Sequence, residues 1–305
     1  MKISTSGRGR SPGPRAATMV GTMRVTVLGL GNMGQAFANR ALHQGHQVTG
    51  WNRTPGRAPE LVAAGATEAT SIADAVPGAD VVLVVLADDQ AVTQVCLGPD
   101  GALAALGADT VLACASTVSP DTARALAEAG PAGRVLDSTV MGAPAAIAAG
   151  KGKFLIGGAE ETVTRLAPLW ADLGAGYTHC GPVGSGATMK LVSNLLLITG
   201  VAALGEALAT ARGHGLSDDL LRSVFAESFV VSEGSKIRLD ALLSTDHPGW
   251  FTPALARKDL RLAIGLAEEA GVGVRIGPAT EQLLGRVIDS GIEWADFSAV
   301  IEALG

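Results

Sequence analysis

Charged residues are scarce in this chain of 305 residues, at 17% of the total against about 25% in an average soluble protein. The formal net charge is −6. This excludes a general nucleic-acid binder, because such a protein needs a positive surface field. Hydrophobic residues reach 48%, which excludes a disordered chain. The length predicts two domains, at about 150 residues each.

Cysteine is also rare, with Cys96, Cys114 and Cys180 far apart in the sequence. An odd, scattered set without a Cys-X-X-Cys pair is typical of free thiols in a reducing compartment, so we predict a cytoplasmic protein. The five histidines lack a cysteine or carboxylate partner at ligand spacing, and we expect no metal site.

Long apolar runs are missing as well. The longest, Leu195 to Gly205, covers 11 residues, whereas a membrane span needs about 18 or more. We therefore predict no membrane partner.

The first 22 residues differ from the rest, since they carry four cations, no acid, and many glycines, prolines and serines. No apolar core of a signal peptide is present, and the amphipathic pattern of a transit peptide is missing. We interpret residues 1–22 as a disordered tail. A misassigned start, with Met19 or Met23 as the true beginning, is the alternative.

Apolar runs and helical segments alternate through the first half, which predicts an α/β domain with a doubly wound parallel sheet over residues 23–183. The runs predicted as buried strands are 25–28, 47–51, 81–86, 111–115 and 135–137. The first helical segments are predicted at 33–44 and 58–64.

The second half reads as helical throughout. Residues 186–212 contain no proline, so they predict one helix about 40 Å long. Helical patterns continue over 217–304 without strand alternation. We therefore predict an all-α domain over 184–305 that begins with this linking helix. Its stretch Leu191–Leu208 is more apolar than one small domain can cover, which predicts a homodimer.

A glycine-rich turn follows the first predicted strand. In a Gly-X-Gly-X-X-Gly sequence, the first glycine permits a tight turn, the second lets the backbone approach a pyrophosphate, and the third lets the helix pack on the strand. The helix start offers free N–H donors to the phosphates. This turn predicts dinucleotide binding by Gly29, Leu30, Gly31, Asn32, Met33 and Gly34.

The end of the second predicted strand indicates which dinucleotide is bound. NAD enzymes usually place an acid there for the ribose hydroxyl, but the residues are Trp51, Asn52, Arg53 and Thr54. The Arg53 guanidinium can bind a 2′-phosphate, with Asn52 and Thr54 as neutral donors. This pattern predicts NADP(H). An ordinary surface role for Arg53 is the alternative.

A second glycine-rich turn, over 181–186, opens the long helix and precedes Lys190 and Asn194. These two residues are four apart and share one helix face. Burial and the helix dipole both lower the pKa of a lysine ammonium placed there. Lys190 can then act as acid or base on a carbonyl or hydroxyl oxygen, with Asn194 holding the lysine or the substrate. Alone, such a pair is more often a surface pair.

Four segments together resemble the β-hydroxyacid dehydrogenases, such as 3-hydroxyisobutyrate dehydrogenase, from about residue 24 to the end. They are Gly29–Gly34 with Gly45-His46, Ser116–Pro120, Gly184–Asn194 and Lys258-Asp259-Leu260.

The resemblance implies a Rossmann domain, an all-α C-terminal domain, and an active site between them. It also implies that Lys190 is the catalytic acid/base beside Asn194, and that family members form dimers or tetramers. Ser116, Thr117 and Lys258 are then expected near the nicotinamide and cofactor. A backbone contact to the cofactor from Leu86 and Ala87, after the third predicted strand, fits the same topology.

The substrate loop departs from the family pattern of Asp, two residues, Val, Ser, Gly, Gly. Met141 stands at the serine position, and a thioether offers no donor to a carboxylate. Met141 followed by Pro144 is similar to imine reductases, which usually carry Asp or Tyr in place of Lys190. We expect substrate contacts from Ser116, Thr139, Val140, Met141 and Gly142.

The sequence thus predicts an NADP(H)-dependent oxidoreductase that transfers hydride between nicotinamide and a small carbonyl or hydroxy compound, of the 3-hydroxyisobutyrate or semialdehyde type. An imine reductase is the alternative. A non-catalytic NADP(H) sensor is a third reading, against which Lys190 argues. The pairs Ser228-Phe229 and Trp250-Phe251 could line the substrate cleft or anchor the core.

Overall fold

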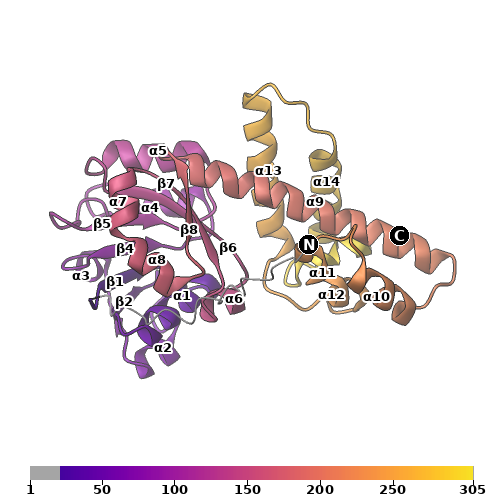
Figure 1. Cartoon of the computed structure of the whole chain (residues 1–305), viewed down its shortest axis with the longest axis horizontal. Helices are drawn as coiled ribbons and strands as arrows, with labels where there is room; N and C mark the ends of the chain where they lie inside the picture. The colour runs from indigo at the N-terminus through magenta and orange to yellow at the C-terminus, as the bar shows by residue number, and fades with distance from the viewer. Residues whose placement is uncertain (1–20, 305) are drawn as a thin grey trace, which may run out of the picture.

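The computed structural model describes residues 21–304. A sheet flanked by helices forms one part, and helices alone form the other (Figure 1). The tail prediction for residues 1–22 lies outside the described residues, apart from Gly21 and Thr22.

Eight strands form a single sheet in the order β3-β2-β1-β4-β5-β6-β7-β8. All five predicted strands are present, which confirms the α/β fold class. The strands are β1 (Arg24–Leu28), β2 (Gln47–Trp51), β3 (Thr67–Glu68), β4 (Val81–Val84), β5 (Val111–Cys114), β6 (Val135–Met141), β7 (Lys153–Gly157) and β8 (Tyr177–Gly181).

The sheet is not parallel throughout, which corrects one detail of the prediction. Strands β1 to β6 pair in parallel, but β7 runs antiparallel to β6, and β8 is parallel to β7. A parallel connection needs a crossover of a dozen or more residues. Residues 142–152, between β6 and β7, hold only one short helix, so the chain turns back directly.

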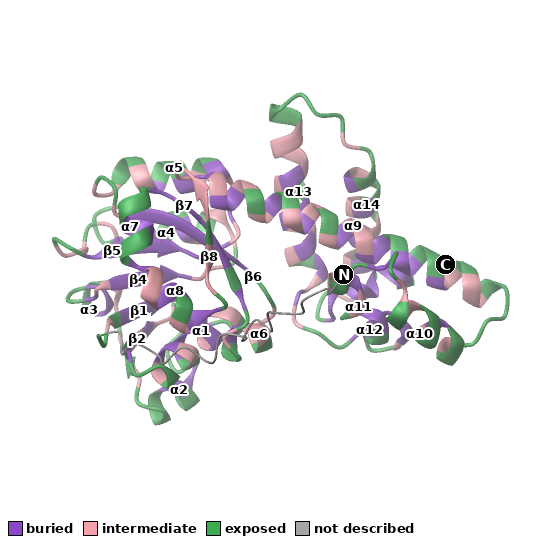
Figure 2. Ribbon diagram, viewed as in Figure 1, coloured by how far each residue is buried: buried purple, intermediate pink, exposed green. Residues whose placement is uncertain are grey.

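Helices cover both faces of the sheet, and each face has its own apolar core. Val25 and Val27 pack into one core and Leu28 into the other, as expected for alternating strand residues. Figure 2 shows the strands largely buried beneath the helices. These helices are α1 (Asn32–His43), α2 (Pro59–Ala63), α3 (Ile72–Ala75), α4 (Asp89–Cys96), α5 (Pro120–Ala129), α6 (Pro144–Ala148), α7 (Glu160–Arg165) and α8 (Ala167–Leu173).

The second half is helical, as predicted, with no strand between residues 217 and 304. Its first helix, α9, has 29 residues and is therefore about 43 Å long. Figure 1 shows α9 running from the sheet across the whole helical part. The elements are α9 (Ser185–Gly213), α10 (Asp218–Glu227), α11 (Glu233–Lys236), α12 (Leu239–Leu243), α13 (Pro253–Glu269), α14 (Ile276–Asp289) and the 3-10 helix η1 (Phe297–Leu304).

Helix α9 is long and apolar enough, by length and composition alone, to cross a membrane. The core helix of a globular domain meets the same criterion. In this fold α9 packs against β6 and β7 near its start and against α13 and η1 further along. Ile198, Val201 and Leu208 of α9 are fully buried in the core of the helical part, which is the arrangement of a core helix.

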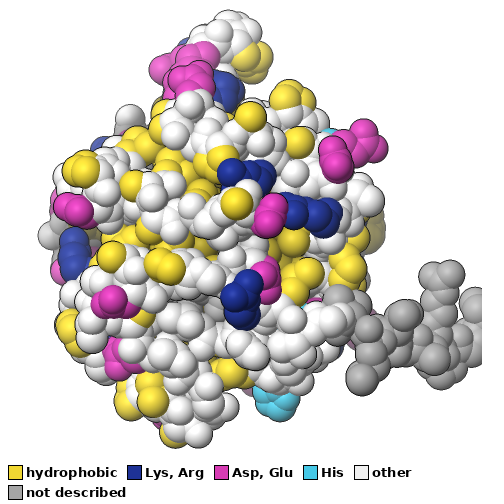
Figure 3. All heavy atoms as spheres, turned by 90° about the vertical axis from the view of Figure 1, so that its left-hand side faces the viewer, with side chains coloured by type: hydrophobic (Ala, Val, Ile, Leu, Met, Phe, Trp, Pro, Cys, Tyr) yellow, Lys and Arg dark blue, Asp and Glu magenta, His cyan; other side chains and the backbone are white. Residues whose placement is uncertain are grey.

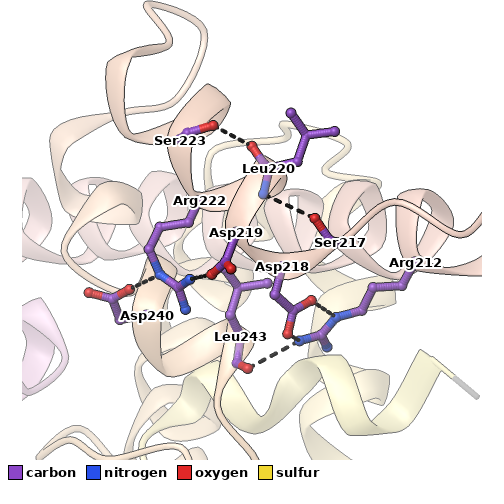
Figure 4. A network of polar contacts seen from close by, with 9 residues as sticks. All are labelled: Arg212, Ser217, Asp218, Asp219, Leu220, Arg222, Ser223, Asp240 and Leu243. Carbon is purple, nitrogen blue, oxygen red and sulfur yellow. Dashed lines mark hydrogen bonds and ion pairs between the residues drawn. The ribbon is translucent and has the colours of Figure 1, made fainter.

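A polar network secures the far end of α9 (Figure 4). Arg212 donates to both carboxylate oxygens of Asp218, at 2.8 and 2.9 Å, and to the Leu243 carbonyl at 3.1 Å. Arg222 joins Asp219 to Asp240. The carboxylates of Asp219 and Asp240 are exposed, so these ion pairs are screened by solvent and add little to stability. Their effect is to hold α9, α10 and α12 in fixed relative positions.

The face of the sheet domain that points away from the helical part carries acidic and basic side chains interspersed among apolar and polar ones (Figure 3). No area of this face is dominated by cations.

Candidate active site

The first glycine turn is shaped to receive a phosphate. A Cβ on Gly29, where φ is +102°, would lie 2.2 Å from the Val85 carbonyl oxygen, and one on Gly34 would lie 1.8 Å from the Gly29 oxygen. A Cβ on Gly31 would meet nothing within 4 Å. No side chain caps the start of α1, so its N–H groups are available to an anion. The residues present therefore fit a dinucleotide pyrophosphate.

A cleft of about 460 Å³ lies between the sheet domain and the helical part. It opens where the carboxyl ends of β1, β4 and β5 meet, the usual ligand position in open α/β sheets. Most of the predicted site residues line this cleft. They are Gly31, Asn32, Met33, Gly34, Leu86, Ala87, Ser116, Thr117, Val140, Gly142, Lys190, Asn194 and Lys258.

Three predicted cofactor residues follow β2, outside the cleft lining. Arg53 and Thr54 are exposed. Asn52 has a structural role in addition to the predicted cofactor contact, because its carboxamide is bonded to the protein backbone at two points. Its Oδ1 accepts the Leu30 N–H at 3.1 Å, and its Nδ2 donates to the Thr54 carbonyl at 3.0 Å. Asn52 thus holds the glycine turn against the end of β2.

Two residues of the predicted substrate loop also lie outside the lining. Thr139 is fully buried, and its hydroxyl lies within hydrogen-bond distance of the Leu155 and Gly186 carbonyls, so it ties β6 to β7 and α9. Met141 is 37% exposed at the end of β6.

Ser116 reaches the cleft, but its hydroxyl accepts the Leu86 N–H and donates to the Val84 carbonyl. It joins the ends of β4 and β5.

Asp137 fixes the start of α9, a role that the sequence analysis did not assign. Its buried carboxylate accepts the Gly184 N–H at 2.9 Å and the Ala187 N–H at 2.7 Å. A Cβ on Gly186 would lie 2.9 Å from the same carboxylate, so glycine is needed for this contact. Burial raises the pKa of Asp137, although these hydrogen bonds oppose the shift. The contact sets where Lys190 enters the cleft.

Lys190 is half-buried and lines the cleft from the second turn of α9. Its pKa lies below the ordinary lysine value, mainly because burial disfavours the charged form. The positive charges of Lys258 and Arg238 lower this pKa further, whereas the carboxylate of Asp259 raises it. The direction agrees with the prediction, and it favours proton transfer nearer to neutral pH.

A hydrogen-bond network lies in the lining of the same cleft as Lys190. Asn194 Nδ2 donates to Asp259 Oδ2 at 2.6 Å, and Lys258 Nζ lies 2.8 Å from Asp259 Oδ1. Lys258 Nζ also donates to the Thr117 carbonyl. The network joins α9, α13 and the end of β5. Asp259 is its centre, although the sequence analysis used that residue only as part of a motif.

The helical part supplies aromatic side chains and one further cation to the cleft. Trp250 and Phe251 line it and stack on each other, with ring centroids 5.7 Å apart. Phe251 also packs on Phe297 in the core, so it fills both predicted roles. Phe229 is 96% exposed and does not line the cleft. Arg238, which the sequence analysis missed, is 6% exposed in the lining.

Across residues 21–304, no group of three or more His, Cys, Asp or Glu side chains is placed to hold an ion. All three cysteines are free thiols, and burial raises the pKa of Cys114 to about 12.

Two family models match the chain. Residues 24–181 match the NAD-binding domain of 6-phosphogluconate dehydrogenase, and residues 184–304 match the NAD-binding region of NADP-dependent 3-hydroxyisobutyrate dehydrogenase. The NAD-dependent L-serine dehydrogenase of Pseudomonas aeruginosa is 32% identical, over 91% of this chain and 96% of that protein.

Solved structures are similar over nearly the whole chain. The 3-hydroxyisobutyrate dehydrogenase of Mycobacterium tuberculosis, solved with L-serine, is 28% identical with a TM-score of 0.78, over 93% of this chain and 99% of the other. A reductive aminase from Aspergillus terreus, in complex with NADPH and ethyl levulinate, is 26% identical with a TM-score of 0.60, over 93% and 100%.

Proposed function

The chain belongs to the β-hydroxyacid dehydrogenase family of NAD(P)-dependent enzymes, and from this membership we propose that it reduces a small carbonyl compound of the semialdehyde type with NADPH. The reverse oxidation of the hydroxy compound uses the same groups. Because the family consists of enzymes, the sensor alternative is set aside.

One observation carries the proposal, namely the position of Lys190. Its ammonium lines the same cleft as the glycine turn, and burial lowers its pKa. NADP(H), bound at that turn, supplies or accepts the hydride. Lys190 Nζ gives a proton to the carbonyl oxygen as negative charge develops there, which typically contributes about 10²–10⁴ in rate. Asn194 lines the cleft beside Lys190, with its amide held by Asp259.

NADP(H) is the cofactor, and we propose that NADPH is preferred over NADH. Arg53 is exposed directly after β2, where its planar guanidinium can bind the 2′-phosphate in a bidentate manner. Arg57, four residues further along the same loop, is also exposed and adds positive charge.

The function is tested by the loss of NADPH absorbance with purified protein and a panel of aldehydes, semialdehydes and imines. We expect turnover of semialdehydes in the presence of NADPH. Lys190→Ala should lose this turnover. The matched control is Lys151→Ala, because Lys151 is exposed and does not line the cleft. The proposal would be contradicted if the protein oxidised NADPH with none of the carbonyl compounds in the panel.

Imine reduction is the second candidate, because the cleft wall is largely apolar. Leu197, Ile237, Trp250, Phe251 and Leu255 line it from the helical part. Such a wall suits an uncharged ketone or imine, and the chain is similar to a reductive aminase. A protonated imine depends less on a proton donor, so faster turnover of imines than of aldehydes, unaffected by Lys190→Ala, would favour this candidate.

We also propose a cytoplasmic homodimer. Its location is supported by the three free thiols. Its assembly is supported by apolar side chains exposed on α9 and the nearby loops, namely Met189, Leu196, Phe229 and Ile237, at 44%, 73%, 96% and 77%. Exposed apolar surface of this kind is typical of an interface.

A further inference from the structure

Arg238 is a buried cation in the cleft lining, and one of its three guanidinium nitrogens has no hydrogen-bond partner among residues 21–304. Its Nε donates to Asp296 Oδ1 at 3.1 Å, and its Nη1 donates to the Gly234 carbonyl at 3.3 Å. Among residues 21–304, Nη2 has no hydrogen-bond partner, yet it is not one of the fully enclosed unpaired atoms. Since Arg238 lines the cleft, this nitrogen is open to a ligand.

The guanidinium of Arg238 is held rigidly. Its Cζ lies 5.4 Å from the ring centroid of Trp250 and 4.6 Å from that of Phe297. Asp296, which is 2% exposed, also accepts the N–H groups of Phe251 and Ser298. Because these contacts already fix the planar group, little side-chain entropy is lost when it binds a second carboxylate.

The charge of the cleft lining favours an anionic ligand. Its charged residues are the cations Lys190, Arg238 and Lys258 and a single carboxylate, Asp259. That carboxylate is already engaged by Asn194 and Lys258. Arg238 is itself paired with Asp296, which lies outside the lining. With Asp296 counted beside Asp259, the three cations still exceed the two carboxylates, so a substrate carboxylate would meet an excess of positive charge.

The side chains of Val140 to Ala143, at the end of β6, offer no hydrogen-bond donor to a carboxylate. Met141 has no donor and lies outside the lining, and the hydroxyl of Ser116 is engaged by the backbone. We propose that Arg238 binds the carboxylate of a carbonyl-acid substrate and thereby determines the specificity of the enzyme. This inference rests on the proposed reductase function and assigns the residue that binds the carboxylate of its semialdehyde substrate.

The test compares succinic semialdehyde with butanal, which has the same carbon chain without the carboxylate. In Arg238→Met, kcat/KM for succinic semialdehyde should fall at least tenfold, mainly through KM, because a charge-assisted contact to the substrate carboxylate is lost. The value for butanal should stay within about twofold. A matched control is Arg222→Met, whose ion pairs lie outside the cleft. An equal fall for both substrates would show a structural role and overturn the inference.

Loss of Arg238 leaves Asp296 buried and unpaired, which can prevent folding. The double variant Arg238→Met/Asp296→Asn removes both charges. The Arg238→Lys variant keeps the positive charge but lacks the planar guanidinium. A selective loss for succinic semialdehyde in either variant supports the inference. Unchanged kinetics with both substrates in folded variants would overturn it.

Succinate binding separates this inference from the reductase proposal. Calorimetry on NADP⁺-loaded protein should show succinate binding to the wild type and at least tenfold weaker binding to the double variant. If the wild type reduces no carbonyl compound but binds succinate through Arg238, the proposed reaction fails and the anion site stands. If the wild type reduces butanal but does not bind succinate, the reaction stands and the anion site is refuted.

Discussion

Replacing Asp259 with asparagine should impair the proton-transfer machinery while leaving the fold intact. Asp259 and Asn194 are each 3% exposed, and their hydrogen bond is 2.6 Å long. A hydrogen bond to a charged group contributes about 1.5–3 kcal/mol. Asparagine has a single acceptor oxygen, so it cannot accept from both Asn194 and Lys258 as Asp259 does. At about 1.4 kcal/mol per factor of ten, loss of the charged hydrogen bond that orients Asn194 predicts a fall in kcat of about 10- to 100-fold.

The pH dependence gives a second, independent measure of the same change. Asp259 raises the pKa of Lys190, so its removal should lower that pKa further. The protonated lysine then persists only to a lower pH. The fall of kcat/KM for carbonyl reduction on the alkaline side should therefore move to lower pH in Asp259→Asn.

The assay is steady-state NADPH oxidation across the pH range, with Glu269→Gln as the control on the same helix. Glu269 is exposed at the end of α13, so this control should show neither effect. A variant with lower kcat but an unmoved alkaline limb would show that Asp259 only supports the fold. A limb that moved to higher pH would refute the electrostatic reasoning.

Two further predictions concern the cofactor and the assembly. Arg53→Asp should erase or invert the preference for NADPH over NADH, because a bidentate contact to phosphate contributes about 1.5–3 kcal/mol; equal kcat/KM for the two cofactors in the unmutated enzyme would contradict this. Light scattering at micromolar concentration should give the mass of a dimer. Leu196→Glu, at a residue 73% exposed on α9, should shift the measured mass toward that of the monomer. A monomeric wild type would refute the proposed assembly.

Local signals in the sequence predicted the features that depend on neighbouring residues. The run of apolar residues at β4 and the turn glycines Gly29 and Gly34 have direct physical reasons, namely burial on both faces and close backbone contact. The spacing of Lys190 and Asn194 likewise placed both on one helix face, and both line the cleft. The antiparallel β7 was missed, because the direction of a strand depends on how the chain returns after β6.

Contacts between distant segments were not predictable in the same way. Asp137 reads as part of a loop motif, but its role at the start of α9 joins residues about 50 positions apart. Thr139 was predicted to touch substrate because of its place in that loop, yet its hydroxyl is used between strands. Arg238 lies in no motif, and only the folded chain brings it beside Trp250 and Asp296.

Single-turnover kinetics of Lys190→Ala test the central claim most directly. Enzyme loaded with NADPH is mixed with a semialdehyde, and the rate of NADPH oxidation is compared with that of the wild type, with NADPH affinity measured separately by fluorescence. We predict that the rate falls by about 10²–10⁴, while NADPH binding changes little. A variant that reduces the semialdehyde at the wild-type rate would contradict the role of Lys190 as the proton donor.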